Sequence, residues 1–219
     1  MAEPYNSALK RRAWPGRAEL GETAFAETER GVVFAHSVIE PLPDERFALI
    51  QARADCLYCE IPWPGAGATF YERAGLEPQP HADLVLSIKA RIVDALRKPT
   101  FVIASHRDAP QFALDELRPI VINGGDAWVA IAYADRLPPP CKTTLDLLAW
   151  LGGQYRSVYD CCCGYGVSLR RFAYAVGSDI DRKCLNYVER EILHGRERQR
   201  NGDGGDAEDS SLSPQPAQE

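Results

Sequence analysis

Residues 158–181, VYDCCCGYGVSLRRFAYAVGSDID, constrain the fold of this chain more than any other segment. The pattern predicts a strand that ends at Asp160, a glycine turn, a helix over residues 167–174, and a second strand over residues 175–178 that ends at Asp179. Glycines at the carboxyl end of a parallel strand permit positive φ angles and let a ligand approach the backbone closely. An acid at the end of the next strand can accept hydrogen bonds from a ribose diol. The segment therefore predicts one complete nucleoside-binding unit of an α/β sheet.

The turn itself, with Gly164 and Gly166, differs from two widespread phosphate-binding motifs. A dinucleotide fingerprint, GxGxxG, needs a third small residue where this chain has Leu169. A phosphate loop, GxxxxGKS/T, occurs nowhere in the sequence. What remains is an adenosine-type ligand with little or no phosphate.

This unit resembles the S-adenosylmethionine (SAM) site of class I methyltransferases, in which a proline and a cysteine or aromatic residue often precede GxG where this chain has CCCGYG. The resemblance implies a doubly wound, Rossmann-like α/β sheet, mostly parallel, with SAM as the cofactor and no required metal. The residues that it assigns to the cofactor are Asp160, Cys161, Cys162, Gly164, Gly166, Asp179, Ile180 and Lys142.

The rest of the central sequence also alternates strand and helix patterns. Such alternation predicts a parallel sheet covered on both faces, here with an antiparallel hairpin at one edge. The predicted strands are 47–52, 56–61, 99–105, and the hairpin pair 120–124 and 127–133; the predicted helices are 81–97, 108–117 and 143–153.

The strand over residues 56–61 runs into Glu60, Ile61, Pro62 and Trp63. Class I methyltransferases that act on exocyclic amines place D/N-P-P-Y/F/W at the end of their fourth strand, so the Pro-Trp half matches and Glu-Ile replaces Asp-Pro. The resemblance implies that the Glu60 carboxylate and the Ile61 carbonyl orient the acceptor amine toward the methyl group. It implies that Pro62 shapes this turn and that Trp63 stacks on a flipped base.

The order of the two motifs adds to the resemblance, which covers residues 45–192. The tetrapeptide comes first, then a hairpin, then Lys142 and a helix, and finally the glycine turn. This is the permuted order of the β-class DNA amino-methyltransferases and of related adenine-N6 enzymes, in which a Lys-Pro precedes that helix. It implies a SAM-dependent methyltransferase whose partner is nucleic acid, DNA before RNA, and whose acceptor is adenine N6 before cytosine N4.

Other interpretations stay open at this point. Asp160 and Asp179 also fit ordinary cap or turn acids. Glu60 is also compatible with a solvated acid at a strand end. Trp63 is compatible with an aromatic residue that packs in the core, and Lys142 with a surface lysine. At the level of the whole chain, the altered tetrapeptide and a net charge of −6 favour a non-catalytic relative that serves as a partner subunit or adaptor. A methyltransferase for a small molecule or a protein is a third interpretation.

Composition sets the remaining expectations. The net charge of −6 opposes broad attraction to nucleic acid, although a local basic face remains compatible with it. No apolar run approaches the ~20 residues of a membrane helix, no signal-peptide core is present, and seven cysteines suit reduced thiols, so we expect a cytoplasmic protein. We expect a flexible polar arm over residues 1–30, a methyltransferase-like domain over 31–194, and a disordered tail over 195–219.

The cysteines and histidines give no complete metal motif. Cys56 and Cys59 end one predicted strand and Cys161–Cys163 end another, and these strands are neighbours in a methyltransferase sheet. Strand alternation, however, points Cys56 and Cys59 to opposite faces, and no second CxxC pair is present. We therefore expect no metal. None of the four histidines is expected to be a ligand: His36, His81, His106 and His194.

Overall fold

A computed structural model describes residues 25–122 and 124–194. They form one eight-stranded sheet with the order β1-β2-β8-β7-β3-β4-β6-β5. The central strands β2, β8, β7, β3 and β4 are parallel, whereas β1 pairs antiparallel at one edge and β6 and β5 pair antiparallel at the other. The strands are β1 (Phe25–Thr28), β2 (Gly31–Ala35), β3 (Cys56–Glu60), β4 (Thr100–Ala104), β5 (Glu116–Ile122), β6 (Gly125–Ala132), β7 (Ser157–Asp160) and β8 (Tyr174–Asp179).

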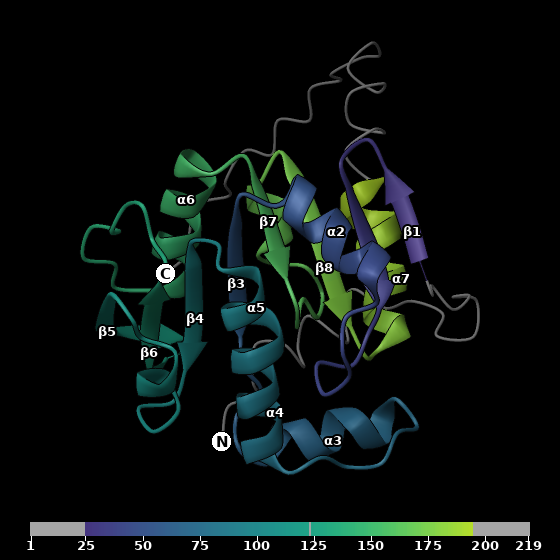
Figure 1. The fold of residues 1–219 in the computed structure, drawn as a ribbon, viewed down its shortest axis with the longest axis horizontal. Coiled ribbons are helices and arrows are strands. Elements are labelled where there is room, and N and C mark those ends of the chain that lie inside the picture. The colour runs from purple at the N-terminus through teal and green to yellow at the C-terminus, as the bar shows by residue number, and fades with distance from the viewer. Residues whose placement is uncertain (1–24, 123, 195–219) are drawn as a thin grey trace, which may run out of the picture.

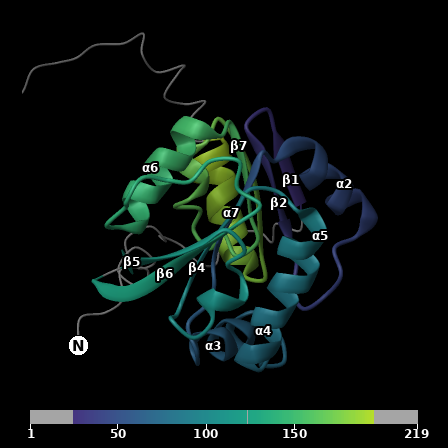
Figure 2. The same cartoon turned by 60° about the vertical axis from the view of Figure 1, so that its left-hand side comes forward.

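Helices cover both faces of this sheet, so the predicted doubly wound, mostly parallel α/β fold is confirmed (Figures 1 and 2). One face carries α2 (Asp44–Arg53) and the continuous helical run of α4 (His81–Ser87), the π-helix η2 (Ile88–Val93) and α5 (Asp94–Leu96). The other carries α6 (Thr144–Gln154), α7 (Arg182–Val188) and the π-helix η5 (Glu189–Leu193). The short helix α3 (Ala66–Arg73) lies beyond the carboxyl ends of the strands (Figure 1).

Alternation along each strand divides the buried residues between two cores, one under each helical layer. The first core includes Val32, Phe34, Leu57, Val102, Tyr159 and Val176 of the sheet, with Ile50, Leu84, Ile88 and Ile92 of the helices. The second includes Val33, Tyr58, Phe101, Ile103, Val158 and Ala175 of the sheet, with Leu147, Leu151, Leu185 and Val188 of the helices.

Two predicted elements near the ends of this pattern were wrong. Residues 47–52 form part of helix α2 rather than a strand, because a short apolar run fits either structure and the first-turn acids Asp44 and Glu45 favour a helix. The helix predicted over 108–117 is reduced to the 3-10 turn η3 (Ala109–Gln111), after which β5 begins at Glu116. The predicted hairpin and the helices over 81–97 and 143–153 are confirmed.

The helix predicted over residues 167–174 was also wrong. The chain makes only the 3-10 helix η4 (Leu169–Arg171), and β8 already begins at Tyr174. The backbone N–H groups of Ala173 and Tyr174 both donate to the carbonyl of Arg156, which holds them beside the start of β7. The parallel pairing of β7 and β8 therefore takes the residues that a longer helix would need.

The predicted domain start at residue 31 also changes. Phe25–Thr28, placed in the flexible arm by the sequence, forms β1 and pairs with β2. The sheet therefore begins earlier than predicted. The rest of the predicted arm and the predicted tail over 195–219 lie outside the described residues.

Candidate functional site

The candidate site lies where β7 and β3 meet at the carboxyl edge of the sheet. From β7 the chain continues to β8 on one side, whereas from β3 it continues to β4 on the other. Open α/β sheets bind ligands in the crevice outside two such strands, at the switch point of the topology. The pairing of Tyr58 with Asp160 confirms the predicted adjacency of the tetrapeptide strand and the glycine-turn strand.

Asp160 is the innermost acid of this edge. Its side chain accepts hydrogen bonds from the backbone N–H of Cys162, at 3.1 Å, and from the hydroxyl of Ser168. Only 3% of the residue is exposed, and burial raises the pKa of its carboxyl well above the usual value. Asp160 therefore fixes the shape of the glycine turn from inside.

Asp179 joins the same turn to the end of β8. One carboxylate oxygen accepts a hydrogen bond from the N–H of Gly164 at 2.8 Å, and the other accepts one from the N–H of Asp181 at 2.8 Å. Burial, the largest cause, raises the pKa of Asp179 to about 7. The predicted ribose acceptor is thus also an anchor for the backbone of the turn.

The two glycines of the turn have different roles. Both have positive φ angles, 49° for Gly164 and 69° for Gly166. A Cβ on Gly166 would lie 2.4 Å from Cδ1 of Ile192, so this position lets η5 and α7 pack against the turn. A Cβ on Gly164 would have no heavy atom within 4 Å. The backbone at Gly164 is therefore open to a ligand.

The tetrapeptide begins at the end of β3. Glu60 is partly buried, and burial, followed by the nearby Cys162 thiol, raises the pKa of its carboxyl to about 7. Ile61 is buried and donates its N–H to the carbonyl of Ile103 at 3.0 Å, which extends the sheet by one residue. Pro62 ends the strand, and Trp63 is 36% exposed. An acid and an exposed aromatic ring therefore flank one fixed backbone segment.

Lys142 lies apart from these residues. It precedes α6 beside the outer strand β5, where its carbonyl accepts the N–H of Val121 at 2.9 Å. Four strand spacings separate β5 from β7, or about 19 Å. The structure thus places Lys142 away from Asp160, whereas Ile180 packs partly buried against the first core beside Asp179.

Two groups of polar residues at this edge were missed by sequence reasoning. Ser168 bonds to Asp160, and its place in GYGVS after the glycine turn is a signal that could have identified it. Ser37, two residues past β2, hydrogen-bonds to the hydroxyl of Tyr71 on α3 at 2.7 Å. Nothing in the sequence pairs these last two, because the contact depends on how α3 closes over the edge.

His81 and Asp108 are hydrogen-bonded near the end of β4, with Nε2 and Oδ2 2.9 Å apart. The hydroxyl of Ser105 donates to the same oxygen at 2.7 Å. Burial favours a higher pKa for Asp108, but the hydrogen bonds of His81 and Ser105 lower it overall. The contact joins the first residue of α4 to the loop after β4, so we interpret its role as structural: it holds these two segments together.

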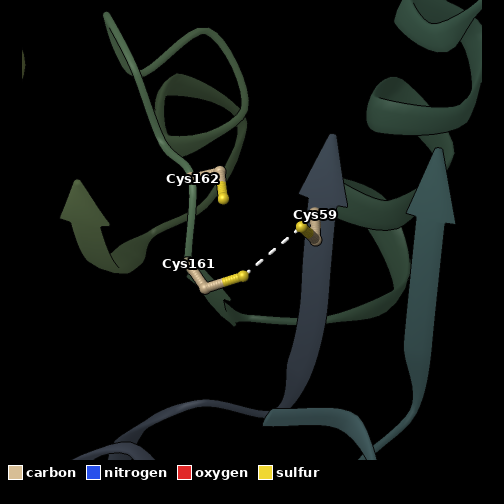
Figure 3. A group of neighbouring side chains, drawn as sticks. All are labelled: Cys59, Cys161 and Cys162. Atoms are coloured by element: carbon tan, nitrogen blue, oxygen red, sulfur yellow. Dashed lines mark hydrogen bonds between the residues drawn. The ribbon is translucent and has the colours of Figure 1, made fainter. Parts of the chain in front are cut away.

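Three thiols converge at the junction of β3 and β7. The sulfur atoms of Cys59, Cys161 and Cys162 all lie within 4.8 Å of one another, and those of Cys59 and Cys161 are 3.3 Å apart (Figure 3). Hydrogen bonds with the other two thiols lower the pKa of Cys161, and the contact with Cys161 raises that of Cys59. The predicted adjacency of the two cysteine groups is confirmed, and it is closer than strand alternation alone indicated.

A cavity of about 380 Å³ lies at the opposite edge of the sheet. It adjoins the amino ends of β3, β7 and β8, and none of the predicted site residues lines it. The lining residues are Glu29, Ala52, Arg53, Asp55, Arg156, Ser157, Ala173 and Tyr174.

The raised pKa of Glu60 predicts a pH-dependent stability. Between the ordinary carboxyl pKa and about 7, the folded chain keeps a proton that the unfolded chain has released, so the free energy of unfolding falls as the pH rises. We expect Glu60→Gln to reduce the loss of stability between pH 5 and pH 8 by about 1–3 kcal/mol. Urea denaturation at both pH values measures this. Glu72→Gln, at an exposed position on α3, should keep the wild-type dependence; an unchanged slope in Glu60→Gln would contradict the prediction.

No family model matches the chain, and no curated protein matches its sequence. Among solved structures, the crystal structure of the M1.HpyAVI–SAM complex matches with a TM-score of 0.45 and 11% sequence identity, covering 74% of this chain and 98% of that one. At this level the likeness concerns the path of the backbone alone. Within residues 25–122 and 124–194, no helix has the length and apolar character needed to cross a membrane.

Proposed function

We propose that this protein is a SAM-dependent methyltransferase that modifies an exocyclic amine of nucleic acid, adenine N6 in DNA before RNA. The observation that carries this proposal is the parallel pairing of β3 with β7 at the switch point of the sheet. It brings the end of the tetrapeptide strand next to the glycine turn, although 100 residues separate Glu60 from Asp160 along the chain. A cofactor and an acceptor amine bound at these two strand ends would be neighbours.

The residues at the glycine turn fit the nucleoside part of SAM. The open space beside Gly164 lets a ligand approach the backbone. Asp179 uses one acceptor site on each oxygen for the N–H groups of Gly164 and Asp181, and a carboxylate has about four such sites. Two therefore remain for a ribose diol. Hydroxyl donors would also favour the charged form of Asp179 and lower its raised pKa.

The tetrapeptide fits the acceptor side. SAM supplies an activated methyl group on a sulfonium sulfur. Glu60 would accept a hydrogen bond, and then the released proton, from the amine whose lone pair forms the new N–C bond. The bond from the methyl carbon to the sulfonium sulfur would break at the same time and leave its electron pair on the sulfur. The Ile61 carbonyl would hold the second N–H of that amine, and Trp63 is exposed enough to stack on a base. Each group acts by positioning, as direct methyl transfer requires.

A second candidate function is a non-catalytic partner subunit with a methyltransferase-like fold. The Glu-Ile replacement in the tetrapeptide favours it, because Ile61 does not fix the backbone as proline would and glutamate carries its oxygens about 1 Å farther than aspartate. A preserved SAM site without transfer to any nucleic acid would support this candidate.

Calorimetric titration with SAM tests the proposal. We expect micromolar binding by the wild type and at least about tenfold weaker binding by Asp179→Ala, which removes the ribose acceptor. Asp126→Ala, at an exposed position on β6, should bind as the wild type does. Circular dichroism establishes that each variant is folded. A folded wild type that binds no SAM would contradict the proposed cofactor.

A further inference from the structure

The cluster of Cys59, Cys161 and Cys162 is a second chemical feature of this edge, and the proposed methyl transfer does not use its sulfur atoms. The resemblance to methyltransferases assigns Cys161 and Cys162 to the cofactor as residues of the glycine turn. The Cys161 side chain points toward Cys59 on β3, and the Cys162 sulfur lies within 4.8 Å of the other two sulfur atoms (Figure 3). The sulfur atoms are therefore free for a different role.

The fold explains why three thiols meet here. The register that pairs Tyr58 with Asp160 places Cys59 opposite Cys161 one step further along, and both lie in the first core. Consecutive strand residues normally point to opposite faces. Here the strand ends at Asp160, and the hydrogen bond from the N–H of Cys162 to the Asp160 carboxylate turns the chain, so Cys162 also packs against the first core.

The neighbouring cysteines point elsewhere. Cys56 and Cys163 both lie in the second core, on the opposite face of the sheet. The thiol of Cys56 donates to the carbonyl of Ser157 at 3.6 Å. The fold thus selects three of the five cysteines at these strands, one from β3 and two from the segment after β7.

The spacing of the three sulfur atoms suits a metal ion. A tetrahedral zinc site with Zn–S bonds of ~2.3 Å has sulfur atoms about 3.8 Å apart. The Cys59–Cys161 distance of 3.3 Å and the limit of 4.8 Å on the whole cluster bracket this value, so small side-chain rotations suffice. Thiolates are the ligands that Zn²⁺ and Cu(I) prefer, and three of them leave one tetrahedral position open.

We propose that Cys59, Cys161 and Cys162 form a three-thiolate site for a soft closed-shell cation, Zn²⁺ in the first place, with its fourth position open to water or another donor. Each thiol releases one proton to solvent as its metal–sulfur bond forms. Binding would tie β3 to the segment after β7. The proposal rests on the thiols alone, so it stands or falls independently of the SAM titration.

The test is metal titration of the reduced, untagged, metal-stripped full chain. With Co²⁺ we expect a sulfur-to-metal charge-transfer band that saturates at one equivalent and disappears when Zn²⁺ displaces Co²⁺. Cys162→Ser, at a half-exposed position, should weaken Zn²⁺ binding by about 10²-fold or more and reduce the Co²⁺ band, since it removes one of three sulfur ligands. Cys59→Ser and Cys161→Ser should do the same where circular dichroism shows them folded.

Matched controls come from the cysteines outside the cluster. Cys56→Ser and Cys141→Ser, the first buried and the second half-exposed, should keep wild-type metal binding. The same site can be tested in the wild type by alkylation followed by peptide mass spectrometry. Zn²⁺ should protect Cys162 from alkylation and leave Cys141 reactive. The absence of a charge-transfer band would overturn the proposal, and so would an unchanged Zn²⁺ affinity in Cys162→Ser.

Discussion

Glu60→Ala is expected to lower the rate of methyl transfer by about 10²–10⁴-fold while SAM affinity stays within about twofold. The carboxylate stands at the end of β3, one strand away from the glycine turn, so its loss removes the proposed acceptor of the amine proton without touching Asp179. Radiolabelled methyl transfer to DNA and RNA measures the rate, and calorimetry measures SAM affinity. Glu60→Gln keeps the size of the side chain and should be nearly as slow, because an amide oxygen is a much poorer proton acceptor.

The same residue predicts the pH profile of the reaction. A group with a pKa of about 7 is ionised, and able to accept a proton, only above that pH, so the wild-type rate should rise through pH 7 and then level off. Glu72→Gln on α3 should follow the wild type in rate and profile. Equal turnover by Glu60→Ala and the wild type would remove Glu60 from the mechanism.

Gly152→Ala is expected to destabilise the fold by about 1–3 kcal/mol, whereas Gly153→Ala should stabilise it by about 0.5–1 kcal/mol. A Cβ on Gly152 would lie 2.4 Å from the carbonyl oxygen of Arg171, and a backbone group cannot move aside as a flexible side chain can. A Cβ on Gly153 would meet nothing within 4 Å. Both glycines lie in the last turn of α6, so the gain in helix propensity is similar for the two variants. A difference in their stability therefore reports the contact between residue 152 and the Arg171 carbonyl.

Urea denaturation of the two glycine variants measures this difference. Arg171 lies in the segment that connects the glycine turn to β8, so Gly152→Ala should also weaken the proposed SAM binding by shifting the turn. Equal urea midpoints for the two variants, or a higher midpoint for Gly152→Ala, would show that α6 does not pack tightly against this segment.

The sequence predicted the sheet better than it predicted what surrounds the strand ends. Runs such as CLYCE and TFVIA were predicted as strands because they are short and mostly apolar, and the glycine pair identified the turn. The prediction of a strand over 47–52 was wrong because its apolar residues can equally well form the buried side of a helix that packs on the face of the sheet. The prediction of a helix over 167–174 was wrong because Tyr174 pairs with β7 as the first residue of β8. This pairing is a long-range contact, and local periodicity carries no information about it.

The thiol cluster shows the same division. Strand alternation correctly placed Cys56 and Cys59 on opposite faces of the sheet. The resemblance to permuted methyltransferases correctly predicted that their strand is a neighbour of β7. The position of Cys162 depends on one hydrogen bond to the Asp160 carboxylate after the strand has ended. No spacing rule describes that bond, so the convergence of the three sulfur atoms became visible only in three dimensions.

The order of strands in the sheet has a consequence for synthesis on the ribosome. β8 lies between β2 and β7, and β7 lies beside β3. The middle of the sheet therefore cannot form until the last third of the chain has been synthesised. About 120 residues separate the end of β3 from the end of β8, which is roughly 6–24 s of translation at ~5–20 residues per second. During that interval β2 and β3 each present an unpaired apolar edge, the kind of surface that recruits other strands. These two edges are therefore paired within the sheet only after β7 and β8 have been synthesised.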